Sequence, residues 1–219
     1  MTPFPIQPPV NRWNPESALG LNSVELLAYR SNLLGADRSV ANWGGGNTST
    51  KSVEMDFRGR ETRVLWVKGS GSDLATIRPH QFTGLRMDDV LPLLERESMT
   101  DEELVAYYEH AVLKPGQPRA SIETPLHSML PFDHIDHTHP DAIISLCAVP
   151  TGRDLANRLW GDHAVWVDYE RPGFSLGKRI ALQVRSHADA TCVLMAKHGL
   201  VTWGDSAEEC YANTIAAIA

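Results

Sequence analysis

Two histidines in the middle of the chain have the residue type and the spacing that could hold a divalent metal ion. His137 and His139 are separated by a single residue in the segment DHTHP (136–140). Residues two apart in an extended chain project to the same face, so both imidazoles can reach one ion. A catalytic zinc ion takes about three protein ligands and leaves a further position for substrate or water. The pair therefore predicts a metal centre whose third ligand comes from elsewhere in the fold.

The third ligand is best assigned to His198, although other histidines compete for the position. His198 follows an expected strand that ends at Ala196, and Gly199 after it would let the backbone turn sharply or lie close to a ligand. A lone histidine is more often a surface or hydrogen-bonded core residue than a ligand, so spacing by itself leaves this choice open. The competing residues are His127, His134 and His163.

A carboxylate and two glycine-rich segments could supply the rest of a reaction site. Glu123 lies in SIETP (121–125), and a carboxylate beside a metal-bound substrate can act as a general base. The segments NWGGGNTS (42–49) and KGSGSD (68–73) combine exposed backbone N–H groups with amide and hydroxyl side chains, which suits a phosphate. Neither segment matches the P-loop or the dinucleotide fingerprint. Together they indicate a site for a phosphorylated small molecule.

The composition and the first residues exclude several classes of partner. The 219 residues carry a formal net charge of -7, which argues against nucleic-acid binding because phosphate backbones demand basic surface. No apolar run approaches the roughly 20 residues that cross a bilayer, so no membrane association is expected. Residues 1–21 form a Pro-rich N-terminal arm without the features of a signal peptide. The cysteines lack C-x-x-C spacing, and we expect reduced thiols in a cytoplasmic protein.

Periodicity and capping residues predict the elements that must position the site. Helices are predicted at 23–34, with Ser23 as the cap, at 175–187, and after capping boxes at 100–103 and 206–209. Strands are predicted at 62–67, 142–149, 164–169 and 190–196. The run AIISLCAV (142–149) is apolar throughout, which is typical of a buried strand. This mixture of helices and strands predicts one layered α/β domain over 22–219. The last predicted helix has no stop signal before Ala219, so we expect the domain to be truncated at its C-terminal end.

Five motifs together resemble the class II aldolase/adducin family. They are GGGNTS (44–49), VKGSGSDL (67–74), SIETPLH (121–127), DHTHPDAI (136–143) and KHGLVTWG (197–204). They occur in the same order as in the family and cover the chain from about Asn22 to its end. In detail the sequence is most similar to the aldolase portion of bifunctional rhamnulose-1-phosphate aldolase/short-chain dehydrogenase proteins.

The resemblance implies a three-layer α/β/α sandwich around a central, largely antiparallel sheet. It also implies one zinc ion per subunit on His137, His139 and His198, with Glu123 as the acid/base. The implied phosphate-binding residues are Asn47, Ser70, Gly71 and Ser121, and the chemistry of the first glycine loop adds Thr48. Ile122 stands where the family often has a second serine. The family forms homotetramers with the site at a subunit boundary, where a neighbour's tyrosine can serve as proton donor.

The subgroup implies zinc-dependent cleavage of a ketose 1-phosphate, L-rhamnulose 1-phosphate, to dihydroxyacetone phosphate and L-lactaldehyde. Its longer members carry a fused dehydrogenase domain. A sugar-phosphate epimerase, dehydratase or decarboxylase with the same metal site is the alternative, followed by a non-catalytic adducin-like binding module and a zinc hydrolase. A Schiff base on Lys68 or Lys197 would be a different route to an aldol reaction.

Overall fold

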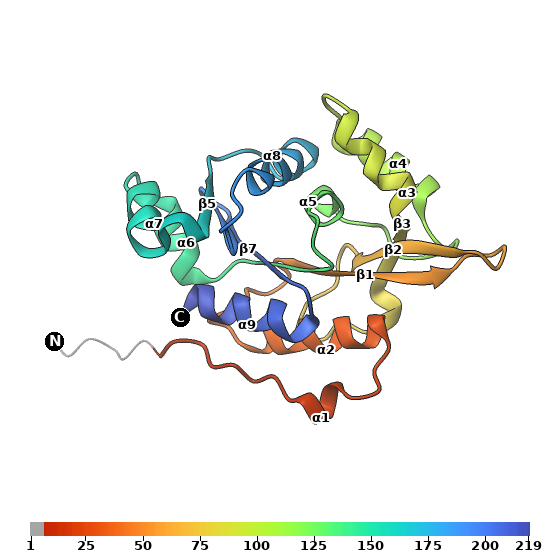
Figure 1. Cartoon of the computed structure of the whole chain (residues 1–219), viewed down its shortest axis with the longest axis horizontal. Coiled ribbons are helices and arrows are strands. Elements are labelled where there is room, and N and C mark those ends of the chain that lie inside the picture. Colours follow the sequence, from red (N-terminus) through yellow and green to blue (C-terminus); the bar gives the residue numbers. More distant parts are fainter. Residues whose placement is uncertain (1–6) are drawn as a thin grey trace.

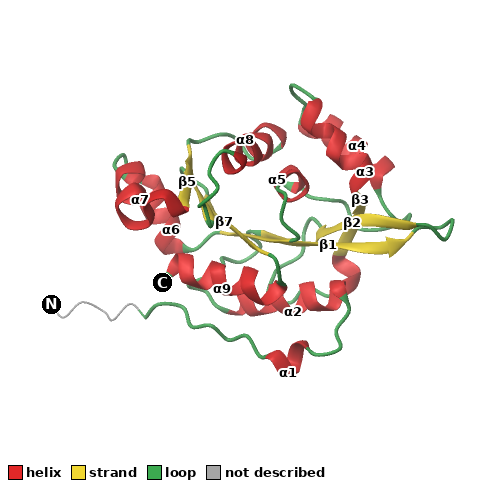
Figure 2. Ribbon diagram, viewed as in Figure 1, coloured by secondary structure: helices red, strands yellow, loops and turns green. Residues whose placement is uncertain are grey.

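A seven-stranded sheet lies between layers of helices in residues 7–219, the part of the chain that this computed structural model describes (Figures 1 and 2). Residues 1–6 of the predicted N-terminal arm lie outside the described residues. The strands are β1 (Asn47–Met55), β2 (Glu61–Lys68), β3 (Phe82–Arg86), β4 (His134–Thr138), β5 (Ala164–Val167), β6 (Cys192–Met195) and β7 (Gly199–Gly204). Their order is β3-β2-β1-β4-β7-β6-β5, and within the described chain only β5 and β6 pair in parallel.

Helices cover both faces of this sheet, with α2 and α9 below it and α5 and α8 above it in Figure 1. The helices are α1 (Pro15–Ala18), α2 (Ser23–Ala36), α3 (Met87–Val90), α4 (Asp101–Ala111), α5 (Thr124–Met129), α6 (Asp141–Ala148), α7 (Gly152–Trp160), α8 (Phe174–Arg185) and α9 (Ala207–Ile218), with 3-10 turns η1 (Pro79–Gln81), η2 (Leu91–Glu95) and η3 (Gly161–His163). In residues 7–219 we find no helix with the length and apolar character to span a bilayer. The predicted three-layer sandwich with a largely antiparallel sheet is confirmed.

The core follows from the alternation of side chains along the strands. In β6, Val193 and Met195 pack with α8 and α5 on one face, whereas Cys192 and Leu194 pack with α6 and α7 on the other. Successive strand residues point to opposite faces, so a strand that is covered on both sides is apolar throughout. The CVLM sequence of β6 has this character, and all four of its side chains are buried.

A capping residue is predicted for three of the four helices, and the structure confirms it for two of them. Thr100 and Glu103 form the predicted capping box, with Thr100 Oγ1 accepting from the Glu103 N–H at 3.2 Å and Glu103 accepting from the Thr100 N–H at 2.9 Å. Ser206 caps α9 at the Glu209 N–H, but the Glu209 carboxylate accepts from Asp205 instead. The cap of α2 is Asn22, so the assignment to Ser23 was wrong by one residue. An asparagine oxygen satisfies the free N–H groups of a first turn as well as a serine does.

The predicted buried strand at 142–149 is wrong, because this segment is helix α6. A continuous apolar run has no period, so it does not separate a buried strand from a buried helix. In the structure Ile143 and Cys147, four residues apart, form the buried stripe against β6 and β7. Asp141 lies in the first turn, where its charge complements the helix dipole. The histidine pair therefore lies at the end of β4 and runs into a helix.

A buried ion pair fastens α2 to the strand that carries the histidine pair. The Arg30 Nε donates to Asp136 Oδ1 at 2.9 Å, and both side chains are fully buried. Arg30 Nη2 also donates to the carbonyl of Ser49 on β1 at 2.6 Å. Thr214 of α9 donates to the other Asp136 oxygen at 3.2 Å. These contacts hold α2 and α9 against β4, on the face of the sheet opposite His137.

Replacing Arg30 with methionine should lower the free energy of unfolding by about 3–5 kcal/mol, because Asp136 would remain buried without its partner. Urea denaturation measures this loss. Arg63→Met is the matched control, since it breaks the half-exposed pair of Arg63 and Asp133 and should cost less than about 1 kcal/mol. Equal losses in the two variants would contradict the assigned role of the buried pair.

Candidate metal centre

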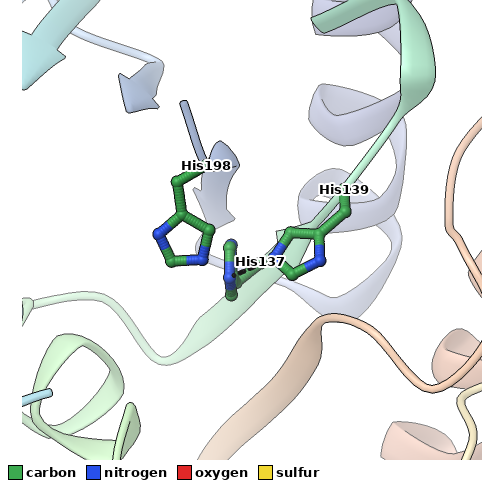
Figure 3. A group of neighbouring side chains, drawn as sticks. All are labelled: His137, His139 and His198. Atoms are coloured by element: carbon green, nitrogen blue, oxygen red, sulfur yellow. Dashed lines mark hydrogen bonds between the residues drawn. The ribbon is translucent and has the colours of Figure 1, made fainter. Parts of the chain in front are cut away.

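Three histidine rings converge above the end of β4 (Figure 3). His137 is on β4, His139 follows its last residue, and His198 lies in the turn between β6 and β7. One ring nitrogen from each lies within 4.8 Å of those of the other two. The Nε2 atoms of His137 and His139 are 3.0 Å apart. Among residues 7–219 this is the group of side chains whose spacing could hold a metal ion.

The sheet register explains why residues so distant in sequence meet. β4 and β7 are antiparallel, with Thr138 opposite Leu200, so the residues just before β7 lie beside the end of β4. Gly199 makes this approach possible, because a Cβ there would lie 2.6 Å from the Thr138 carbonyl oxygen and 2.9 Å from the His139 ring. Gly45 has the same role on the other side of His139, since its Cβ would lie 2.7 Å from the ring Nδ1.

The donor set fits a divalent cation with a preference for imidazole nitrogen. The Nδ1–H of fully buried His137 donates to the Leu200 carbonyl at 2.9 Å, which leaves the Nε2 lone pair free to face the other rings. Three nitrogen ligands with an open side are typical of catalytic zinc. Within residues 7–219, the buried Oε1 of Glu123 has no hydrogen-bond partner and lies on this side. A cation would satisfy the three ring nitrogens, and this oxygen would face a molecule bound beside the cation.

Glu123 faces the histidines from the start of α5. Its Oε1 lies 3.2 Å from His198 Nε2 and 3.5 Å from His137 Nε2. Burial raises the pKa of the Glu123 carboxyl, but the adjacent rings of His137 and His198 outweigh burial and hold the pKa below its usual range. The carboxyl is therefore ionised and can accept a proton from a bound molecule.

The protonation of two of the rings is set by opposing effects. Burial, followed by the charges of His137 and His198, lowers the pKa of His139 to about 3, so this ring is neutral. Burial also lowers the pKa of His137, but the adjacent Glu123 carboxylate outweighs it and the net shift is upward. A neutral imidazole is the form that binds a metal, and a bound cation would favour that form at His137 as well.

The two glycine loops contact each other and the segment that carries Glu123. The Gly44 N–H donates to the Asp73 carboxylate at 2.7 Å, which joins the first loop to the second. The Ser70 N–H donates to the Arg119 carbonyl at 2.9 Å, and Gly69 pairs with Ala120. Ser70 and Gly71 therefore lie beside the segment that leads into Ser121.

Asn47 and Ser121 contact Glu123 directly. The Asn47 Nδ2 donates to Glu123 Oε2 at 2.8 Å, and the Ser121 Oγ accepts from the Glu123 N–H at 3.2 Å. The expected phosphate residues Asn47, Ser70, Gly71 and Ser121 thus belong to segments that the fold brings together near the histidines.

Thr48 is not part of this arrangement. Its side chain is fully buried, and its Oγ1 lies 2.6 Å from the Ser31 hydroxyl of α2. Thr48 pairs with Asp136 and its neighbour Asn47 pairs with His137, so the alternation of β1 turns the two side chains to opposite faces. The Thr48 side chain therefore does not point toward the expected phosphate site, unlike the prediction from the sequence.

The competing histidines have other partners. His134 contacts Arg30 at 3.0 Å and Thr50 at 2.9 Å, and His163 contacts the Asp189 carbonyl at 3.2 Å. His127 is fully buried between Ser49 and Asn47. The contact of His127 with Asn47 was not foreseen from the sequence. The sequence signal for a role of His127 near Glu123 was the spacing of four residues between them, because this spacing puts both side chains on one face of a helical turn.

Lys68, which the sequence offers only as a possible Schiff-base lysine, lies at the end of β2. The side chain is only 6% exposed, and burial lowers its pKa while the carboxylates of Asp73 and Glu123 oppose this shift. A buried cation beside Glu123 adds positive charge to a site that is expected to bind a phosphate.

Comparisons with known proteins agree with this geometry. The family described as Class II Aldolase and Adducin N-terminal domain matches residues 25–218. The "Uncharacterized oxidoreductase YuxG" of Bacillus subtilis (strain 168) is 56% identical over 207 residues, which are 94% of this chain. The chain spans only 30% of the length of that relative.

Solved structures show the same fold. The N-terminal class II aldolase domain of a conserved protein from Thermoplasma acidophilum is 37% identical, with a TM-score of 0.88 over 95% of each chain. A sugar-phosphate aldolase from Thermotoga maritima is 17% identical, with a TM-score of 0.64 over 89% of each chain, and shares the fold. The matched family and these relatives lead to one conclusion: the chain belongs to the class II aldolase/adducin family.

Proposed function

We propose that this chain is a zinc-dependent aldolase that cleaves a ketose 1-phosphate to dihydroxyacetone phosphate and an aldehyde. The observation that carries the proposal is the position of the Glu123 carboxylate, whose Oε1 lies 3.2 Å from His198 Nε2 at the edge of the three-histidine cluster. Membership of the family supports it, because aldolases are among the solved proteins of the same fold. We propose L-rhamnulose 1-phosphate as the substrate and L-lactaldehyde as the aldehyde, on the basis of the motif resemblance.

His137, His139 and His198 would hold the zinc ion. When bound, zinc supplies Lewis-acid polarisation of a substrate carbonyl. In the cleavage direction the C3–C4 bond breaks and its electron pair stays on the dihydroxyacetone phosphate carbon, while the C4 hydroxyl loses its proton and becomes the aldehyde. The C4 proton passes to a second group, which by family resemblance is a tyrosine of a neighbouring subunit. In the synthetic direction the ionised Glu123 removes a proton from C3 of dihydroxyacetone phosphate. In cleavage Glu123 first takes up a proton from solvent and delivers it to C3, while the second group returns the C4 proton to solvent.

The substrate phosphate would be bound at the two glycine loops. Ser70 and Gly71 would contribute from the second loop, Asn47 from the start of β1, and Ser121 from the segment before α5. The φ of Gly71 is +85°, a conformation that turns the backbone at little cost only in glycine. Backbone N–H groups in such turns form a concave site for anions.

We also propose that the protein is a cytoplasmic homotetramer and that the full-length chain carries a fused dehydrogenase domain. The length of the B. subtilis relative and its name as an oxidoreductase support the fusion, since this chain covers 30% of that protein. Light scattering of the purified protein tests the tetramer directly. A monomer at micromolar concentration would contradict it.

Purified protein should release dihydroxyacetone phosphate from L-rhamnulose 1-phosphate, and a strong chelator should abolish this release, because the proposed reaction requires the metal as a Lewis acid. Addition of zinc should restore it. A coupled glycerol-3-phosphate dehydrogenase assay measures the triose phosphate. Conversion of the sugar without triose phosphate would instead indicate an epimerase, dehydratase or decarboxylase.

Two outcomes would overturn the zinc mechanism. Cleavage that survives complete removal of the metal is the first. The second is a stable adduct after borohydride treatment with substrate, because only an imine on a lysine such as Lys68 or Lys197 is trapped in this way.

A further inference from the structure

A chain of hydrogen bonds leads from β1 through α5 to the Glu123 carboxylate. The Ser49 hydroxyl lies 2.8 Å from His127 Nδ1, and His127 Nε2 is hydrogen-bonded to Asn47 Oδ1. The Asn47 Nδ2 in turn contacts Glu123 Oε2 at 2.8 Å. Ser49 and His127 are fully buried and Asn47 is 3% exposed, so water does not compete for these bonds.

The hydrogen bond between Asn47 and Glu123 determines which atom is the donor in each of the other hydrogen bonds. The Asn47 Nδ2 donates to the Glu123 oxygen Oε2, so the Asn47 atom that faces Glu123 is the amide nitrogen. The Asn47 atom that faces His127 is then the amide oxygen, which accepts from an Nε2–H. With its proton on Nε2, neutral His127 accepts at Nδ1 from the Ser49 hydroxyl.

His127 is held in the neutral form by its surroundings. Burial lowers its pKa well below the ordinary value, and the charges of His137, Lys51 and Arg30 act in the same direction against the opposing effect of Glu123. Both ring nitrogens have partners within the described chain, so neither is available to a metal ion. The ring is therefore neither a ligand nor an acid.

The two oxygens of Glu123 have different environments. Oε2 accepts from Asn47, whereas Oε1 has no hydrogen-bond partner in residues 7–219 and lies 3.2 Å from His198 Nε2. The Asn47 amide thus fixes the orientation of the Glu123 carboxylate, so that Oε1, which has no hydrogen bond in residues 7–219, faces the histidine cluster.

We propose that His127 is a positioning residue that orients the Asn47 amide, so that Asn47 holds Oε2 of Glu123 and leaves Oε1 free to exchange the substrate proton. This inference rests on the proposed function for the role of Glu123. Without the Nε2–H, the buried Asn47 oxygen would lose its donor and only Glu123 would orient the amide, so the flipped orientation, with the amide oxygen toward the carboxylate, would be less strongly excluded. The Glu123 carboxylate would then have the correct orientation toward the reacting carbon for only part of the time.

A matched pair of variants tests this role. His127→Gln places an amide N–H near the position of Nε2, whereas His127→Asn reaches only the position of Nδ1. We expect His127→Asn to lower kcat by about 10- to 100-fold, as is typical when a supporting hydrogen bond is lost, with KM and zinc content unchanged. His127→Gln should recover most of the loss. Thermal unfolding identifies any variant that is not folded, and Ser49→Ala is a milder variant that should reduce kcat in the same direction.

The tautomer is measured without substrate by ¹⁵N NMR of the histidine rings in the zinc-loaded protein. We expect a protonated Nε2 and a bare Nδ1 at His127 across neutral pH, and a shift of the Asn47 side-chain amide signal in His127→Asn. A protonated Nδ1, or an unchanged Asn47 signal, would overturn the proposed network.

The outcomes separate the two proposals. If the wild type releases triose phosphate and His127→Asn has the same kcat, the positioning role is overturned while the aldolase stands. If the wild type releases none, the proposed function falls, and the network is supported or overturned by the tautomer and the Asn47 signal alone.

Discussion

Replacing His198 with alanine should leave the protein folded but without stoichiometric zinc. His198 supplies one of three nitrogen ligands, and the remaining pair cannot complete a tetrahedral site. Loss of a supporting hydrogen bond already weakens metal binding by about 10- to 100-fold, and loss of a ligand should exceed this. Elemental analysis after dialysis against a competing chelator measures the zinc that remains.

A histidine variant outside the site shows whether zinc is lost because a ligand is missing or because the fold is disturbed. His163→Ala removes an exposed histidine whose contact is the Asp189 carbonyl, and it should keep the zinc content of the wild type. Zinc should also raise the unfolding temperature of wild-type protein and of His163→Ala but not of His198→Ala, because a ligand stabilises the state that binds it. Full zinc occupancy in His198→Ala would show that the ion is bound elsewhere.

Replacing Glu123 with glutamine should abolish most of the cleavage while zinc remains bound. The change preserves the size of the side chain but removes the group that exchanges the proton, and general acid–base catalysis contributes about 10²- to 10⁴-fold. We therefore expect kcat to fall by this factor, measured by release of dihydroxyacetone phosphate at saturating substrate. Zinc content should stay at that of the wild type, since the three histidines are intact.

Glu109→Gln is the control for this second prediction. It makes the same chemical change on the exposed face of α4 and should leave kcat unaltered. Cleavage by Glu123→Gln at the wild-type rate would mean that another group moves the proton. A loss of both zinc and cleavage would instead identify the carboxylate as a metal ligand.

Much of the fold was predictable because local rules sufficed. The helix from the box at Thr100 and Glu103 has the cap that its sequence predicts. Strand β2 and helix α8 lie within one or two residues of the predicted ranges, since β-branched residues in one and amphipathic spacing in the other are local signals. The sequence by itself also determined the family, from five motifs in order, and that one face of an extended segment carries His137 and His139.

Only the tertiary structure decided the rest. The segment 142–149 is a helix, and its side chains Ile143 and Cys147 pack against β6 and β7. A continuous apolar run does not indicate which of its residues will be buried in this way. The side chain of Thr48 points away from the site because the register of β1 against β4 is set by pairing across the sheet. His198 approaches His139, and His127 approaches Asn47, through contacts between residues that are far apart in the chain. Spacing along a sequence predicts which face a residue lies on, but which faces meet depends on how strands and helices pack in three dimensions.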